Sequence, residues 1–184
     1  MKKGELTKKT IANAFKSLME TEEYESITIT DITDKCDLNR LTFYYHFKDK
    51  SDLLRWIFID DVIKPAKEEI DAYDWKRRLE RILGEMYIRK SFYVKIITYE
   101  RLDVWNYMFA AAEDMMRETV LARNGERTVD ENDVWFVSYF FAFGIAGSIY
   151  DWAAKGMKEP PDELKQRFAY LVEVLKQQAA YFSN

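Results

Sequence analysis

Apolar residues recur at three- and four-residue spacing along almost the whole chain, which is the period of amphipathic helices. In the segment from Thr7 to Glu22, Ile11, Phe15 and Leu18 fall on one face and lysines fall on the others. The chain holds six glycines and three prolines, too little turn chemistry for a many-stranded sheet. The pattern therefore predicts an all-α fold.

Two short helices should follow the first. Thr28 is a suitable N-cap for a helix at Ile29–Cys36, and Asp31 three residues further on completes a capping box. A three-residue turn ending at Asn39 then leads into a third helix, Arg40–Phe47, for which Asn39 is a favoured N-cap. Two short helices joined in this way are typical of a helix-turn-helix.

A fourth helix should link this N-terminal unit to the remainder of the chain. Asp49 is its predicted cap, and its apolar pattern continues from Lys50 until Pro65, which should end or kink it because proline lacks an N–H. We accordingly divide the chain into a helix-turn-helix head at residues 1–49 and a helical body at residues 50–184.

The body should contain five further helices. Ser91 and Asp130 are suitable N-caps, and Gly125 and Gly156 are suitable C′ residues. Proline fits the first turn of a helix, so the last helix should start at Pro161 and return antiparallel to the one before it. The predicted ranges are Trp75–Lys90, Ser91–Glu100, Val104–Asn124, Asp130–Lys155 and Pro161–Phe182.

Composition excludes several classes of protein. With one cysteine, Cys36, and one histidine, His46, the chain can form neither an intrachain disulfide nor a His/Cys metal site, so we expect no metal or other cofactor. Cys36 is interpreted as a structural thiol. No window of about 18 apolar residues is evident, so we expect no membrane segment and a cytoplasmic protein. No Ser/His/Asp, Cys/His or phosphate-loop grouping favours an enzyme.

The net charge of −4 argues against a protein that coats nucleic acid through bulk charge, so any DNA contact must be local. The third helix provides a place for it. Phe43 and Phe47 are four residues apart and should face the core, which leaves the remaining side chains outward. These outward residues offer a guanidinium, hydroxyls and aromatic rings to a major groove: Arg40, Leu41, Thr42, Tyr44, Tyr45 and His46.

Two lysines follow this helix. Lys50 stands at the amino end of the fourth helix, where an ammonium and free backbone N–H groups together can anchor a phosphate, and Lys48 can add to it. We expect Arg40→Ala to affect one operator position, and Lys50→Ala to weaken binding to all sequences.

The segments at residues 27–32, ITITDI, and 38–50, LNRLTFYYHFKDK, resemble the DNA-binding head of TetR/AcrR-family regulators over about the first 55 residues. The resemblance implies that Thr42, Tyr44 and Lys50 contact phosphates and that Arg40, Leu41 and Tyr45 meet base edges. It also implies help from Thr28 and Thr30 on the supporting helix, and a phosphate or base-edge contact for His46. The sequence departs from the family pattern at Asp37 and Leu41, where glycine is common.

The body resembles the family only in length, helical content and its two long terminal helices. Its aromatic and methionine residues belong to a core or line a ligand pocket, for which the candidates are Met86, Tyr87, Trp105, Met108, Phe109, Trp135, Tyr139 and Phe143. Small and apolar residues of the last two helices favour a four-helix dimer interface over a purely intrachain pair. The candidates are Ala142, Ala146, Ile149, Ala153, Phe168, Leu171 and Leu175.

These observations favour a homodimer that places two recognition helices in successive major grooves of double-stranded operator DNA. The resemblance implies a repressor that an unidentified small-molecule effector releases from DNA. The alternative is a regulator or co-activator that a protein partner controls. In both hypotheses residues 1–49 bind DNA, and residues 50–184 provide dimerisation and effector binding.

Overall fold

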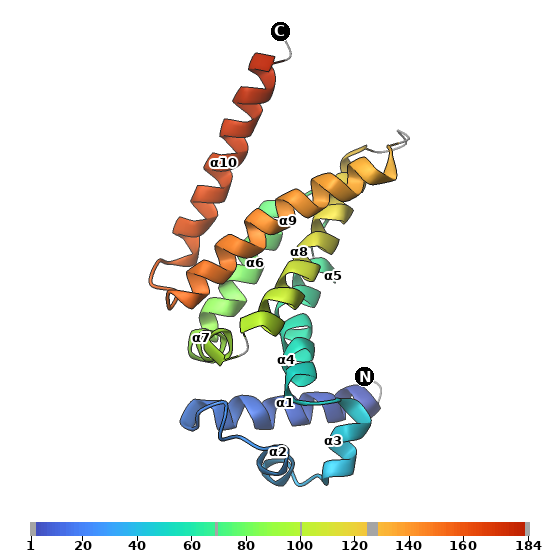
Figure 1. Ribbon diagram of the computed structural model, residues 1–184, viewed down its shortest axis with the longest axis vertical. Coiled ribbons are helices and arrows are strands. Elements are labelled where there is room, and N and C mark those ends of the chain that lie inside the picture. The colour runs from blue at the N-terminus through green and yellow to red at the C-terminus, as the bar shows by residue number, and fades with distance from the viewer. Residues whose placement is uncertain (1–2, 69, 100, 125–128, 183–184) are drawn as a thin grey trace.

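A computed structural model describes residues 3–68, 70–99, 101–124 and 129–182, and every regular element among them is helical. Figure 1 shows a small head of three helices below a larger body. The head consists of α1 (Lys3–Thr21), α2 (Ile29–Lys35) and α3 (Arg40–His46). The all-α prediction is confirmed.

The body begins with a linker of three continuous segments. They are α4 (Lys50–Phe58), the π-helical turn η1 (Ile59–Ile63) and α5 (Lys64–Glu68). Pro65 does not end the helix, because the chain stays helical to Glu68, so that part of the prediction is wrong. The departure from α geometry lies just before the proline, at the π turn, in the region where a proline ring in a regular α-helix would clash with a preceding carbonyl.

Five helices complete the body, close to the predicted ranges. α7 starts one residue before Ser91, so Ser91 is not its N-cap. Asp130 does cap α9, and Gly156 follows the C-cap with φ +79°, whereas Gly125 lies outside the described residues. The helices are α6 (Trp75–Ile88), α7 (Lys90–Tyr99), α8 (Arg101–Asn124), α9 (Glu131–Ala154) and α10 (Pro161–Phe182).

The last two helices form a V. α9 packs along α8, and α10 starts at Pro161, turns back and diverges from α9 (Figure 1). The lower part of α10 packs on α6, where Leu164 and Phe168 are buried and Lys165 pairs with Glu80 at 3.3 Å. The predicted antiparallel return is therefore correct in direction, but the two helices are not closely packed.

α9 is long and apolar enough to cross a membrane by length and composition, with a mean hydropathy of 1.3 over its best window. The statement that no window of about 18 apolar residues is evident is therefore wrong for α9, but this alone does not contradict the expectation of no membrane segment. One helix of this kind is weak evidence for a membrane span, and α9 is paired lengthwise with α8 in the helical body.

One continuous core joins head to body. Phe15 of α1 is fully buried and makes edge-on ring contacts with Tyr24 of the head and Phe92 of α7. Lys95 of α7 donates to the carbonyls of Met19 and Glu22 at the end of α1, at 3.0 and 3.1 Å. These contacts fix the platform on which α3 is presented.

Candidate nucleic-acid interface

The supporting helix α2 is held by the predicted capping box. The Asp31 amide donates to the Thr28 hydroxyl at 3.2 Å, and the Asp31 carboxylate accepts from the Thr28 amide at 2.7 Å. The Thr28 hydroxyl also donates to that carboxylate at 2.6 Å, and these bonds lower the pKa of Asp31. The box fixes where α2 begins.

Asp31→Asn is expected to lower the thermal midpoint at pH 7, because the amide accepts the Thr28 bonds less strongly than the carboxylate. The folded pKa lies below the unfolded value of about 4, so the carboxylate stabilises the fold above that pH and loses this effect as pH falls through the folded pKa. Thermal melts between pH 3 and 7 should show the wild type and Asp31→Asn converging at the acid end. A difference independent of pH would contradict this role.

The turn into α3 depends on two residues. Asp37 has φ +58°, in the left-handed region that aspartate tolerates better than most residues, so the departure from glycine is accommodated. Asn39 then caps α3, since its side-chain oxygen accepts from the Thr42 amide at 2.8 Å and from the Thr42 hydroxyl at 3.0 Å. Burial raises the pKa of the Cys36 thiol just before this turn, so it stays protonated at neutral pH, as a structural thiol would.

α3 has a buried face and an outward face. Phe43 and Phe47 are buried, 5.7 Å apart between ring centroids, and anchor the helix to the head. On the outward face Leu41 is 81% exposed and Tyr45 is 84% exposed. Tyr44 is 47% exposed, so neither tyrosine of α3 is packed inside the protein.

The remaining α3 residues lie around this outward face. Arg40 is exposed and donates weakly to the Tyr44 hydroxyl at 3.4 Å. Thr42 is half-buried at its cap, and His46 is half-buried with its ring 4.9 Å from that of Tyr45. The structure thus brings Arg40, Leu41, Tyr44 and Tyr45 together on one surface.

The supporting residues divide into two kinds. Thr28, Thr30 and Lys48 are exposed beside α3. Lys50 instead points inward, and its ammonium donates to the carbonyls of Tyr24 at 2.9 Å and Ile27 at 2.7 Å and lies 4.2 Å from the Tyr24 ring centroid. The predicted phosphate contact of the Lys50 ammonium conflicts with this geometry, because two buried carbonyls already occupy it.

Two family models cover most of the chain. The model described as "Bacterial regulatory proteins, tetR family" matches residues 11–57, and the one described as "Transcriptional regulator C-terminal region" matches residues 73–174. The chain belongs to the TetR family of transcriptional regulators. The family assigned from the head alone therefore holds for the body as well.

A curated relative of this TetR-family chain is the HTH-type dhaKLM operon transcriptional activator DhaS of Lactococcus lactis subsp. lactis (strain IL1403). The two are 36% identical over 101 residues, which is 55% of this chain and about half, 54%, of that protein. The names of the family and of this relative are those of transcription regulators and not of enzymes.

Two solved structures share the fold. The dihydroxyacetone kinase operon activator DhaS aligns with a TM-score of 0.68 at 23% identity, covering 94% of this chain and 95% of that one. The TetR family repressor AlkX from Dietzia sp. strain DQ12-45-1b aligns with a TM-score of 0.51 at 14% identity, covering 92% and 95%. The fold therefore serves a protein named as an activator and one named as a repressor.

The body contains an apolar groove of about 480 Å³ bounded by α6, α8, α9 and α10. Two of the predicted pocket residues, Met86 and Met108, line it. Sequence reasoning missed the linker residues Phe58 and Ile63, which also line it, because their helical spacing is that of ordinary core residues.

The other predicted pocket residues lie elsewhere. Tyr87 is partly exposed and stacks on Trp152. The remainder form a separate cluster of touching rings on the α8–α9 pair, which we call the aromatic patch: Trp105, Phe109, Trp135, Tyr139 and Phe143. On α9 these rings occupy the flank opposite the groove residues Val137, Phe141 and Ile145.

The predicted dimer residues also divide. Ala142, Ala146, Ile149 and Ala153 are at most 5% exposed within the single chain, on the side of α9 that faces the core. They are packed within the single chain, and Ala146 and Ile149 also line the groove, so we do not carry them into an interface. On α10 Phe168 is buried too, whereas Leu171 and Leu175 are 48% and 42% exposed.

Proposed function

We propose that the chain is a cytoplasmic homodimer that binds a near-palindromic operator through α3 of each copy and loses affinity when a small molecule occupies its body. The observation that carries the proposal is the outward face of α3, fixed from behind by Phe43 and Phe47. If the operator overlaps a promoter, the bound protein is a repressor and its release allows transcription. If the operator lies beside a promoter, the bound protein can act as an activator.

The contacts that we propose follow the exposure of each side chain. Arg40, Leu41 and Tyr45 read base edges, since the first offers a guanidinium suited to guanine and the others apolar surface for a thymine methyl. A second group of side chains binds phosphates. In this group Lys48 replaces Lys50, whose ammonium the sequence analysis predicted to be a phosphate contact. The group is Thr28, Thr30, Thr42, Tyr44, His46 and Lys48.

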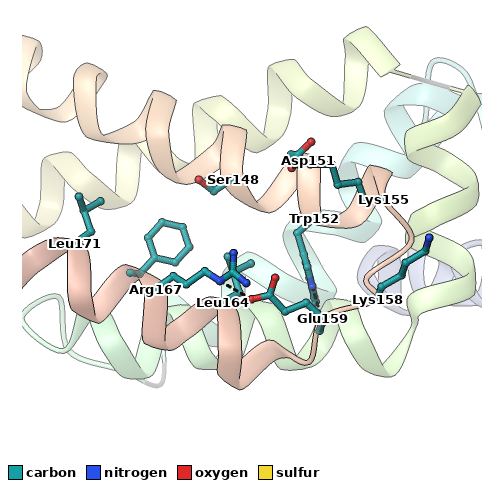
Figure 2. Close-up of a pocket in the computed structure, with 10 residues that line it drawn as sticks. Ser148, Asp151, Trp152, Lys155, Lys158, Glu159, Leu164, Arg167 and Leu171 are labelled. Atoms are coloured by element: carbon teal, nitrogen blue, oxygen red, sulfur yellow. Dashed lines mark hydrogen bonds and ion pairs between the residues drawn. The ribbon is translucent and has the colours of Figure 1, made fainter.

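Dimerisation through α9 and α10 is supported by apolar residues that the single chain leaves exposed. Phe136 and Phe140 are 60% and 64% exposed on the face of α9 opposite its buried side. Figure 2 shows Ser148 and Asp151 on α9 and Leu171 on α10, and these residues line a cleft of about 430 Å³ between the two helices. We propose that helices of a second copy pack against this open side of the V, completing a four-helix interface.

Communication between body and head is supported by the π turn of the linker. Phe58 directly precedes this turn, Ile63 is its last residue, and both line the groove. Two acidic residues of the same turn pair with lysines of α1. The Asp61 carboxylate lies 2.9 Å from the Lys16 ammonium, and the Asp60 carboxylate lies 3.6 Å from the Lys9 ammonium. A ligand that displaces Phe58 or Ile63 would shift the acidic pair and tilt α1, provided that it binds the two states unequally.

Control by a protein partner is the second candidate, and the aromatic patch favours it. Trp135 and Phe143 are 52% and 46% exposed within this cluster, and large exposed aromatic surfaces are typical of protein interfaces. If a partner protein binds the aromatic patch, the Trp135→Ser variant should bind that partner more weakly than the wild type does. If a ligand in the groove controls the protein, Trp135→Ser should respond to the ligand as the wild type does.

Selection of bound sites from a random DNA pool by the full chain tests the proposal. We expect a near-palindromic site with half-sites about one helical turn apart, since two α3 helices enter successive major grooves. Arg40→Ala should weaken binding by about 1–3 kcal/mol and relax specificity at one position in each half-site. Enrichment of no sequence, or an equal loss on all sequences for Arg40→Ala, would overturn it.

A further inference from the structure

The groove in the body changes from buried to exposed along its length. At one end Met86, Met108 and Phe58 are at most 4% exposed. At the other end Val137 and Leu175 are 37% and 42% exposed. The lining follows α8 from Met108 to Arg123, roughly 22 Å at about 1.5 Å per residue. The groove is therefore a long apolar channel with a closed inner end and an open rim.

The charged residues of the lining are all cationic. They are Arg78, Arg123 and Lys176, and among the described residues no acidic side chain lines the groove. Arg78 is buried and already paired with Glu118 at 2.9 Å, which compensates its charge. Arg123 and Lys176 are exposed, and neither has an ion pair within the described part of the chain. Two positive charges that form no ion pair with the described residues thus stand at one end of an apolar channel.

We infer that the groove binds a long-chain carboxylate, with its alkyl chain along α8 towards Met86 and Met108 and its carboxylate beside Arg123 and Lys176. The volume of about 480 Å³ lies in the range of small-molecule sites. The apolar walls exclude a polar sugar or nucleotide, which would lose its hydrogen bonds there. The inference rests on the proposed function, in which the groove is the effector site.

Isothermal titration of the full chain with decanoate, dodecanoate, tetradecanoate and hexadecanoate, each below its micelle concentration, tests the inference. Binding should tighten by about tenfold for each added pair of methylenes until the groove is filled. Hexadecan-1-ol and hexadecylamine should bind at least tenfold more weakly than hexadecanoate. Equal affinity for acid, alcohol and amine, or no binding of any acid, would overturn the inference.

Paired variants locate the site. Arg123→Ala/Lys176→Ala should weaken hexadecanoate by about tenfold and leave hexadecan-1-ol unchanged. Ala112→Trp fills the middle of the groove and should abolish binding, whereas Ala110→Trp, on an exposed position of the same helix, should not. If both Arg123→Ala/Lys176→Ala and Ala112→Trp bound hexadecanoate as the wild type does, the ligand would lie outside the groove. If Ala112→Trp instead produced monomers with intact ligand binding, a second copy would occupy the groove and the inference would be wrong.

These titrations contain no DNA, so the two proposals fail separately. Loss of operator binding with normal carboxylate binding would refute the proposed function and leave the ligand class standing. Normal operator binding with no carboxylate binding would refute the ligand class alone.

Discussion

Phe43→Ala should destabilise the protein by about 3–5 kcal/mol and strongly weaken operator binding. The Phe43 side chain is fully buried and contacts the rings of Tyr44 and Phe47, so its removal leaves a cavity beneath the reading helix. Phe-to-Ala changes in a core cost about 3–5 kcal/mol, against a total stability of about 5–15 kcal/mol for a typical protein. Urea denaturation should show the loss of stability, and fluorescence anisotropy with an operator duplex should show strongly weakened binding.

Tyr45→Ala is the matched control, because Tyr45 lies two residues away on the same helix and is 84% exposed. We expect its unfolding free energy to stay within about 0.5 kcal/mol of the wild type. Its operator affinity should nevertheless fall by about 1–3 kcal/mol, the range of a base-edge contact. A Phe43→Ala protein as stable as the wild type, or a Tyr45→Ala protein with full affinity, would contradict this division between anchor and reader.

The ends of the short helices could be predicted from the sequence because the chemistry that sets them is local. Thr28, Asn39 and Asp49 each cap a helix through a backbone amide three residues away. Such a contact depends only on residue type and spacing. The inward positions of Phe43 and Phe47 follow from the helical period in the same way.

The burial of α9 could not be predicted in this way, because α9 is apolar on nearly every side and its periodicity does not mark one face as the core. We expected its small residues Ala142, Ala146 and Ala153 to meet a second copy. They allow α8 to approach closely instead. The bulky rings then divide between the aromatic patch, the groove and the outward face, a division that depends on where neighbouring helices lie.

The contacts of Lys50 in the head could not be predicted from the sequence either. Substitution of Lys50 is also expected to have the second large effect on stability. The Lys50 ammonium donates to backbone carbonyls 23 and 26 residues earlier in the chain. Every residue has a backbone carbonyl, so the residue types in the sequence do not indicate which carbonyls it will bind. A lysine at the start of a helix next to a DNA-reading element is therefore interpreted as a phosphate anchor. The fold shows a clamp that ties α4 to the loop between α1 and α2.

Lys50→Met should accordingly destabilise the head by about 2–4 kcal/mol, since two charge-assisted hydrogen bonds are lost and two carbonyls lose their donor. The methionine keeps most of the apolar stem, so the change isolates the ammonium. Thermal melts of the DNA-free protein should reveal the loss directly. Any loss of operator affinity should track the unfolded fraction and disappear at temperatures where the variant is fully folded.

Lys48→Met is the control, since Lys48 is exposed two residues earlier. We expect it to melt like the wild type and to lower the slope of log K against log salt by about 0.9, the value for one lost phosphate contact on duplex DNA. Lys50→Met should leave that slope unchanged. A wild-type melt for Lys50→Met together with a reduced slope would mean that its ammonium leaves the two carbonyls for a phosphate on binding. The clamp would then be a state of the DNA-free protein alone, and the start of α4 would itself rearrange on the operator.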